Sequence, residues 1–223
     1  FIKDYNLVIS ISRYTKNWVK KIHGIDSVLL FPPTNIKKYF SSDKEKIILS
    51  VGRFFIGSHN KKQIEMIRVF KRLYDFYPEA MKGYEYHLCG KAHHEGEVHK
   101  EYLLKCKNVA KGYPIYFHED FTFEELRKFY SKSMIFWHGA GFGEDPNKDP
   151  DKFEHFGMVT VEAMASGVVP IVINMAGQKE IVKDTNDKIE LEKQAEKLTN
   201  EITNLNEENI NISKDKLQKD NNK

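Results

Sequence analysis

The sequence predicts an α/β fold built on a Rossmann-like, doubly wound parallel sheet. Short apolar runs alternate with longer amphipathic stretches through the middle of the chain, as in successive β-α-β units. The apolar runs are rich in β-branched and aromatic residues and do not alternate with polar ones, which is typical of strands buried on both faces. With 223 residues, of which 40% are hydrophobic, the chain can bury such a core.

Five strands and two strongly patterned helices define the main domain, which we place at residues 36–185. The predicted strands are 46–52, 85–90, 114–118, 134–138 and 168–174. The segment 61–77 is predicted to be a helix because its apolar residues share one stripe. The members of that stripe are Ile64, Ile67, Phe70, Leu73 and Tyr74. A second helix begins with a capping box formed by Thr122 and Glu125.

The two ends of the chain differ from this domain. Residues 1–35 hold one strand, "LVISIS", a helix and the stiff "FPPTN", so we interpret them as the end of an N-terminal domain followed by a linker. Because the sequence starts at Phe1, we also expect it to be a fragment of a longer protein. In residues 186–223, six apolar residues follow alternating spacings of four and three, interrupted at Asn209; this favours an amphipathic helix over a coiled coil, followed by a disordered Asn/Lys-rich tail. These six are Leu191, Ala195, Leu198, Ile202, Leu205 and Ile212.

The composition excludes several classes of protein. Basic and acidic residues are nearly balanced, 35 against 32, so the charge does not favour a nucleic-acid partner. Cys89 and Cys106 form no disulfide framework, and we expect a cytoplasmic protein. No apolar run reaches the roughly 20 residues that cross a bilayer. Basic residues around Trp18 could touch the inner face of a membrane, although a solvated helix face is the favoured interpretation.

The loops that follow the strands carry the candidate binding residues. In an open parallel sheet, ligands bind beyond the carboxyl ends of the strands. Arg53 follows the first strand directly, and Lys61, favoured over Lys62 by the helical register, stands at the start of the next helix. A helix that begins near Gly157 would direct free N–H groups at an anion, and glycine would let a phosphate approach closely. We therefore expect a phosphate site between these segments.

Two glutamates flank the start of that helix. Glu154 lies in the loop before it and could reach a sugar, while Glu162 lies one and a half turns inside and could accept hydrogen bonds from ribose hydroxyls. An isolated pair of glutamates at this spacing is usually a helix-start charge and a solvated residue. The spacing alone is therefore a weak signal.

Four segments together resemble the C-terminal, nucleotide-sugar-binding half of the retaining group 1 glycosyltransferases of family 4 type, which have the GT-B fold. They are "SVGRFF", "HNKKQ", "WHGAGFGED" and "EHFGMVTVEAMASGVVPIVINMAGQKEIV". The resemblance covers about residues 1–184. It implies a retaining hexosyltransferase that moves a sugar from a nucleoside diphosphate to a hydroxyl of a glycan or lipid-linked acceptor, with no cofactor and no obligatory metal.

The resemblance also assigns roles to residues. Glu154 matches the glutamate near the transferred sugar, and Arg53 and Lys61 match the basic pair on the donor diphosphate. Donor contacts are implied for the backbone of Phe156, Gly157, Met158 and Val159, and a ribose contact for Glu162.

Two departures keep a second hypothesis open. Ala176 and Gly177 stand where the family has two glycines, and the acceptor-binding domain is nearly absent. The chain could therefore be a donor domain that is inactive alone, or a non-catalytic nucleotide-sugar-binding or interaction module.

Other motifs give weaker signals. The segment "HHEGEVHKE", with three histidines, does not match a zinc pattern and is interpreted as a solvated loop before a helix. The segment "EDPNKDPD" lacks the ligand alternation of a calcium loop and is interpreted as a loop near the acceptor side. Trp137 and His138 end a predicted strand, and they either shape the sugar pocket or are a packed aromatic beside a hydrogen-bonded histidine.

Overall fold

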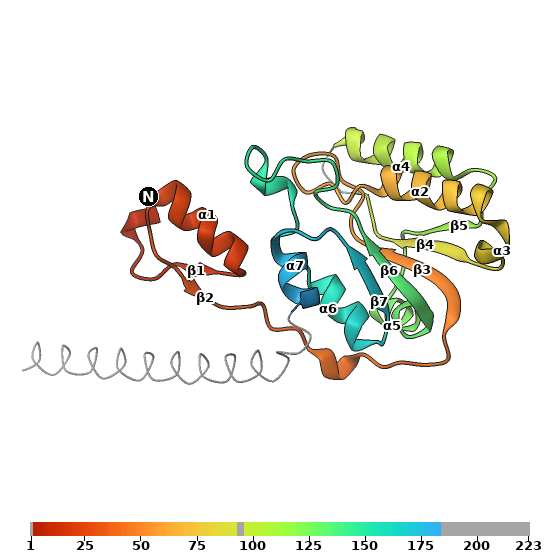
Figure 1. Ribbon diagram of the computed structural model, residues 1–223, viewed down its shortest axis with the longest axis horizontal. Coiled ribbons are helices and arrows are strands. Elements are labelled where there is room, and N and C mark those ends of the chain that lie inside the picture. Colours follow the sequence, from red (N-terminus) through yellow and green to blue (C-terminus); the bar gives the residue numbers. More distant parts are fainter. Residues whose placement is uncertain (1, 93–95, 184–223) are drawn as a thin grey trace, which may run out of the picture.

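A five-stranded parallel sheet with the order β5-β4-β3-β6-β7 forms the centre of the molecule in a computed structural model that describes residues 2–92 and 96–183 (Figure 1). The strands are β3 (Glu45–Val51), β4 (Glu85–Cys89), β5 (Ile115–His118), β6 (Ser133–His138) and β7 (Val169–Val172). All five predicted strands are confirmed, with ends that move by two residues at most. The strand order reverses between β3 and β6, which makes the sheet doubly wound.

Helices cover both faces of the sheet (Figure 1). One face carries α2 (Gln63–Phe76), α3 (Pro78–Met81) and α4 (Glu97–Ala110), and the other carries α5 (Phe123–Lys132), α6 (Met158–Ala165) and α7 (Ala176–Lys183). Each face of the sheet has its own hydrophobic core: the first core lies against α2 and α4, and the second lies against α5 and α6. Successive residues of β3 point to opposite faces, so Ile48 packs in the first core and Leu49 in the second. Burial on both faces explains why the strands lack polar alternation.

The two predicted helices form as expected. In α2 the stripe residues Ile64, Ile67 and Phe70 are buried. At the start of α5 the Thr122 hydroxyl accepts a hydrogen bond from the Glu125 N–H at 3.2 Å, and the Glu125 carboxylate accepts one from the Thr122 N–H at 2.6 Å. The capping box is therefore confirmed.

A small N-terminal unit precedes the sheet. It contains η1 (Ile2–Asp4), β1 (Ile9–Ser10), α1 (Arg13–His23) and β2 (Val28–Leu29), and η2 (Ile36–Lys38) lies on the way to β3. The strand β1 is shorter than the predicted "LVISIS", and its parallel partner β2 was not predicted. Helix α1 lies beside α7 (Figure 1).

Some predictions meet the structure only in part. His93, His94 and the tail 186–223 lie outside the described residues. The solvated-loop interpretation was wrong for His99, which is buried in the first turn of α4 and accepts a hydrogen bond from the Ile56 N–H at 3.2 Å. Within residues 2–92 and 96–183, no helix combines the length and apolar character that a membrane span requires.

Candidate functional site

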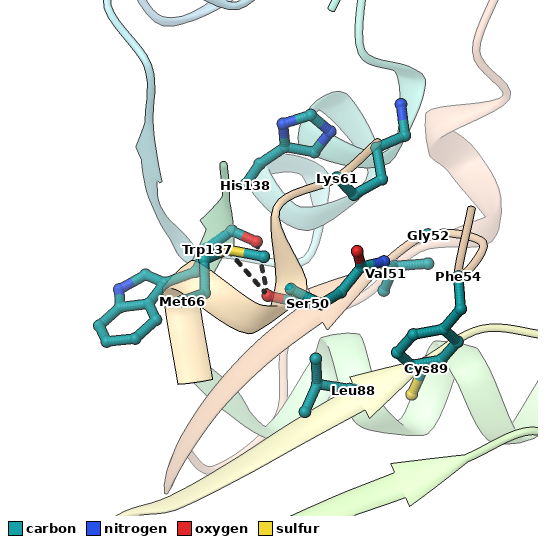
Figure 2. Close-up of a pocket in the computed structure, with 11 residues that line it drawn as sticks. Ser50, Val51, Gly52, Phe54, Lys61, Met66, Leu88, Cys89, Trp137 and His138 are labelled. Atoms are coloured by element: carbon teal, nitrogen blue, oxygen red, sulfur yellow. Dashed lines mark hydrogen bonds between the residues drawn. The ribbon is translucent and has the colours of Figure 1, made fainter. Parts of the chain in front are cut away.

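Lys61, Glu154 and His138 meet beyond the carboxyl ends of β3 and β6. The Lys61 ammonium lies 2.6 Å from Oε2 of Glu154, and Nε2 of His138 lies 3.1 Å from the same oxygen. Figure 2 shows the Lys61 and His138 side chains on the same side of the end of β3. The structure therefore unites two predicted residues, and it adds His138 as their neighbour.

Side-chain amides fix the loop that carries Lys61. Asn60 donates from Nδ2 to the Phe55 carbonyl at 2.6 Å and accepts from the Lys62 N–H at 2.7 Å. Gln63, which is buried, donates from Nε2 to the Arg53 carbonyl at 3.0 Å. These bonds hold Lys61 at the start of α2 without a regular secondary structure around it.

The start of α6 has the geometry of an anion-binding helix terminus. Gly157 is the N-cap with φ of +105°, and a Cβ placed there would lie 2.5 Å from Nε2 of Gln178. Gln178 is itself fixed, since its Oε1 accepts from the Thr160 hydroxyl at 2.8 Å. Within the described part of the chain, no acceptor pairs with the N–H groups of residues 157–159. The phosphate contact there stays a prediction, with free donors available to make it.

The charges of the site favour an ionised Glu154. Burial opposes ionisation of this carboxyl, but the contacts with His138 and the positive Lys61 outweigh it and lower its pKa to about 2. Burial also lowers the pKa of His138, more than the nearby Glu154 raises it, so the ring is neutral at pH 7. The site therefore presents a carboxylate paired with one ammonium group.

Arg53 and Glu162 are not among the residues that contact Lys61, Glu154 and His138. The Arg53 side chain is exposed and makes no ion pair within the residues that the structure describes, so it is accessible to a ligand. Glu162 accepts a hydrogen bond from the Tyr130 hydroxyl at 3.0 Å, and its carboxylate contributes, after burial, to the raised pKa of Tyr39. The ribose contact of Glu162 stays a prediction, and the Tyr130 phenol, which sequence analysis did not anticipate, holds its carboxylate.

The remaining residues that were predicted to contact the donor lie around the start of α6. Phe156 is buried and its ring centroid lies 5.8 Å from that of Phe31, whereas Met158 is half exposed and Val159 packs partly buried in the second core. For these residues the expected contact is through the backbone, so side-chain burial does not obstruct it.

The structure separates the two residues that end β6. Trp137 packs against Tyr86, with ring centroids 5.5 Å apart, in the core below the sheet end. The Ser50 hydroxyl donates to the Trp137 carbonyl at 2.7 Å, as Figure 2 shows. His138 points to the opposite side and reaches Glu154. The sequence contained a signal for this separation, because successive side chains of a strand project to opposite faces of the sheet.

The acidic loop after β6 is neutralised by lysines. Lys62 lies 2.5 Å from one oxygen of Glu144, and Lys152 lies 3.0 Å from the other. These contacts attach the loop to the start of α2. They also give the adjacent lysines different partners, since Lys61 pairs with Glu154 and Lys62 with Glu144.

Comparisons with known proteins agree with this architecture. A relative from Dictyostelium discoideum, the GDP-Man:Man(3)GlcNAc(2)-PP-Dol alpha-1,2-mannosyltransferase, is 24% identical over 202 residues, which are 81% of this chain and 37% of that protein. The sucrose-phosphate synthase of Thermosynechococcus elongatus superposes with a TM-score of 0.56 at 20% identity, over 77% of this chain and 41% of that one.

An alpha,alpha-trehalose-phosphate synthase (UDP-forming) from Burkholderia vietnamiensis gives a TM-score of 0.59 at 11% identity, over 79% of this chain and 48% of that one. These two likenesses confirm the expected GT-B type of α/β fold. The chain spans less than half of each of these three proteins. The family model of the group 1 glycosyl transferases matches residues 32–223. The chain therefore belongs to the group 1 glycosyltransferases.

Proposed function

We propose that this chain is the donor-binding part of a retaining hexosyltransferase, which transfers a sugar from a nucleoside diphosphate to a hydroxyl acceptor. The observation that supports the proposal best is the Lys61–Glu154 pair beside the free N–H groups of α6. A cation and a helix N-terminus suit a diphosphate, while a carboxylate suits sugar hydroxyls.

The proposed chemistry uses positive charge where the bond to the leaving group breaks. When the bond between the sugar carbon and the diphosphate oxygen breaks, negative charge grows on the diphosphate. Arg53, Lys61 and the α6 N–H groups would stabilise that charge. Since the pKa of Glu154 is low, its carboxylate would accept hydrogen bonds from the sugar and would not supply a proton.

The relative's name suggests which substrates to test first. That protein is a GDP-Man-dependent mannosyltransferase acting on a PP-Dol-linked glycan. By analogy we propose GDP-mannose as the first candidate donor and a lipid-linked glycan as the acceptor class. A lipid-linked acceptor would place the protein at the cytoplasmic face of a membrane through peripheral contact.

Calorimetric titration of the chain with GDP, UDP and ADP tests the proposal. We expect one diphosphate to bind, and Lys61→Ala to weaken it about 10- to 100-fold, as for a lost charge-assisted hydrogen bond. Lys62→Ala is the matched control, because that neighbouring lysine pairs with Glu144. Arg53→Ala and Glu162→Ala should also weaken binding, at the diphosphate and at the nucleoside. Absence of binding by the folded chain would favour the non-catalytic module.

Glu154→Gln separates sugar contact from nucleotide contact. This variant should leave the affinity for the diphosphate within about threefold, because the carboxylate is assigned to the sugar. It should lower turnover in the enzyme that contains both domains. Equal losses of diphosphate affinity in Glu154→Gln and Lys61→Ala would contradict this division of roles.

A further inference from the structure

One edge of the sheet, the face of β7 on the side of α2, is uncovered in the described part of the chain. The helices α2 and α4 bury the residues of β3, β4 and β5 on that side, and the core that they form also takes in Trp137 of β6. Beyond them, Ile135 and Trp137 of β6 stand in register with Val169 and Ile171 of β7, so the four side chains share the face. Val169 and Ile171 are 63% and 53% exposed. Apolar β-branched residues on a strand of a parallel sheet normally lie under a covering element.

The bare region is hollowed as well as apolar. A groove of about 210 Å³ runs between α2 and β7, with Met66 and Val69 on the helix side and Ile171 on the strand side. Phe142, 54% exposed, stands on its rim, and Val69 is 44% exposed. We call the exposed residues Val69, Phe142, Val169 and Ile171 the β7 face. A contiguous apolar groove of this kind fits an amphipathic helix.

We propose that the C-terminal segment 191–205 of this same chain occupies the β7 face. Its sequence supplies an apolar stripe at spacings of four and three, the pattern of one helical side. As a helix its 15 residues would be about 22 Å long, longer than the four residues of β7, which span about 13 Å. The stripe consists of Leu191, Ala195, Leu198, Ile202 and Leu205.

The segment has sufficient reach. Helix α7 ends at Lys183, on the opposite side of the sheet, so seven residues separate it from Leu191. A chain of seven residues spans up to about 25 Å, and two layers on opposite sides of a sheet lie about 20 Å apart, since each packs about 10 Å from it. Residues 184–190 can therefore pass around β7, whose outer edge has no partner strand in the described part of the chain.

The family match supports an occupant from this chain. It continues past α7 and the β7 face to residue 223, so the tail belongs to the matched domain. A segment tethered to the domain also has a high effective concentration at the groove, an advantage that a separate partner lacks.

A nitroxide on the tail tests this contact in the full chain. Cys89 and Cys106 are buried, at 1% and 0% exposure, so a new cysteine in Gln194→Cys can be labelled selectively. Methyl NMR signals of Val69, Val169 and Ile171 should lose at least half their intensity. The signal of Ile115, on β5 at the far edge of the sheet, should keep it.

Two tail variants and a mixed sample decide the result. Leu198→Asp, on the stripe, should restore the three signals, whereas Lys197→Asp, next to it and off the stripe, should not. Unchanged intensities in the labelled chain, or an equal effect of the two variants, would overturn the proposal. So would signal loss in a mixture of nitroxide-labelled and methyl-labelled chains, since it would identify a second copy as the occupant.

Discussion

Glu154 keeps its charge in a site where burial alone would favour the protonated form. Lys61 supplies the opposing charge at 2.6 Å, and His138 adds a polar contact from a side chain that is almost fully buried. The balance lowers the pKa of Glu154 from its ordinary value of 4.5 to about 2. Because the folded state binds this proton less readily than the unfolded state, folding is linked to pH.

The linkage predicts how Glu154→Gln changes acid stability. A carboxyl with a depressed pKa in the folded state adds stability above about pH 4.5, and this stability is lost as the pH falls towards 2. At pH 7 the variant should have a free energy of unfolding lower by about 1–3 kcal/mol, because Lys61 loses its partner. The difference from the unmodified chain should shrink steadily as the pH is lowered from about 5 to 2.

Urea denaturation at a series of pH values measures this difference. Glu101→Gln, an exposed glutamate on α4, serves as the matched control and should show little change at any pH. A gap between Glu154→Gln and the unmodified chain that stays constant from pH 7 to 2 would show that the carboxylate's ionisation is not linked to folding.

At the level of elements, α1 is attached to the main domain through its N-terminus. The N–H groups of Arg13 and Tyr14, in its first turn, donate to the two oxygens of Glu180 on α7 at 2.9 and 2.7 Å. Ser12 caps the same terminus by accepting from the Thr15 N–H at 3.1 Å. A carboxylate at a helix N-terminus also interacts favourably with the helix dipole. Glu180 therefore stabilises α1 and joins it to α7.

Glu180→Ala should loosen α1 selectively. Loss of an N-terminal capping interaction costs about 0.5–2 kcal/mol, so amide exchange within α1 should accelerate about 3- to 30-fold. Hydrogen exchange followed by NMR checks this, with the amides of β3 as an internal reference that should stay unchanged. Glu79→Ala, at an exposed glutamate of α3, is the control variant. Equal acceleration in α1 and β3 would mean that the contact stabilises the whole fold.

Local sequence patterns predict the helices and strands, but they do not predict contacts between segments that are distant in the sequence. The strands of the main sheet can be predicted because burial on both faces leaves continuous apolar runs. The start of α5 can be predicted because Thr122 and Glu125 are three residues apart and form a capping box. The contacts of Glu180 with α1 and of Tyr130 with Glu162 join residues 166 and 32 positions apart. No periodicity encodes such pairs, so the partners of Glu162 could not be predicted, although its position on α6 could.

At the scale of the whole molecule, burial is unevenly distributed. The main domain has two core layers that share the sheet, and side chains such as Leu49 and Phe70 are completely buried. In the N-terminal unit α1 has no fully buried residue, and its strands contribute two residues each. Several of the unit's apolar side chains are exposed, namely Leu7, Ile9, Ile11, Ile22 and Val28. Two-stranded sheets without a large core are marginally stable, so this unit depends on its attachment to α7.

This distribution predicts two levels of opening in the full chain. The amides of α1 should exchange through a local opening that detaches the N-terminal unit, at a free energy at least about 2 kcal/mol below that of β3 and β6. Because the local opening exposes little surface, the α1 free energy should depend weakly on urea, and that of the central strands strongly. Native-state hydrogen exchange at increasing urea concentrations, read by mass spectrometry, measures both slopes. A single free energy and a single slope for α1, β3 and β6 would show instead that the chain unfolds as one cooperative unit.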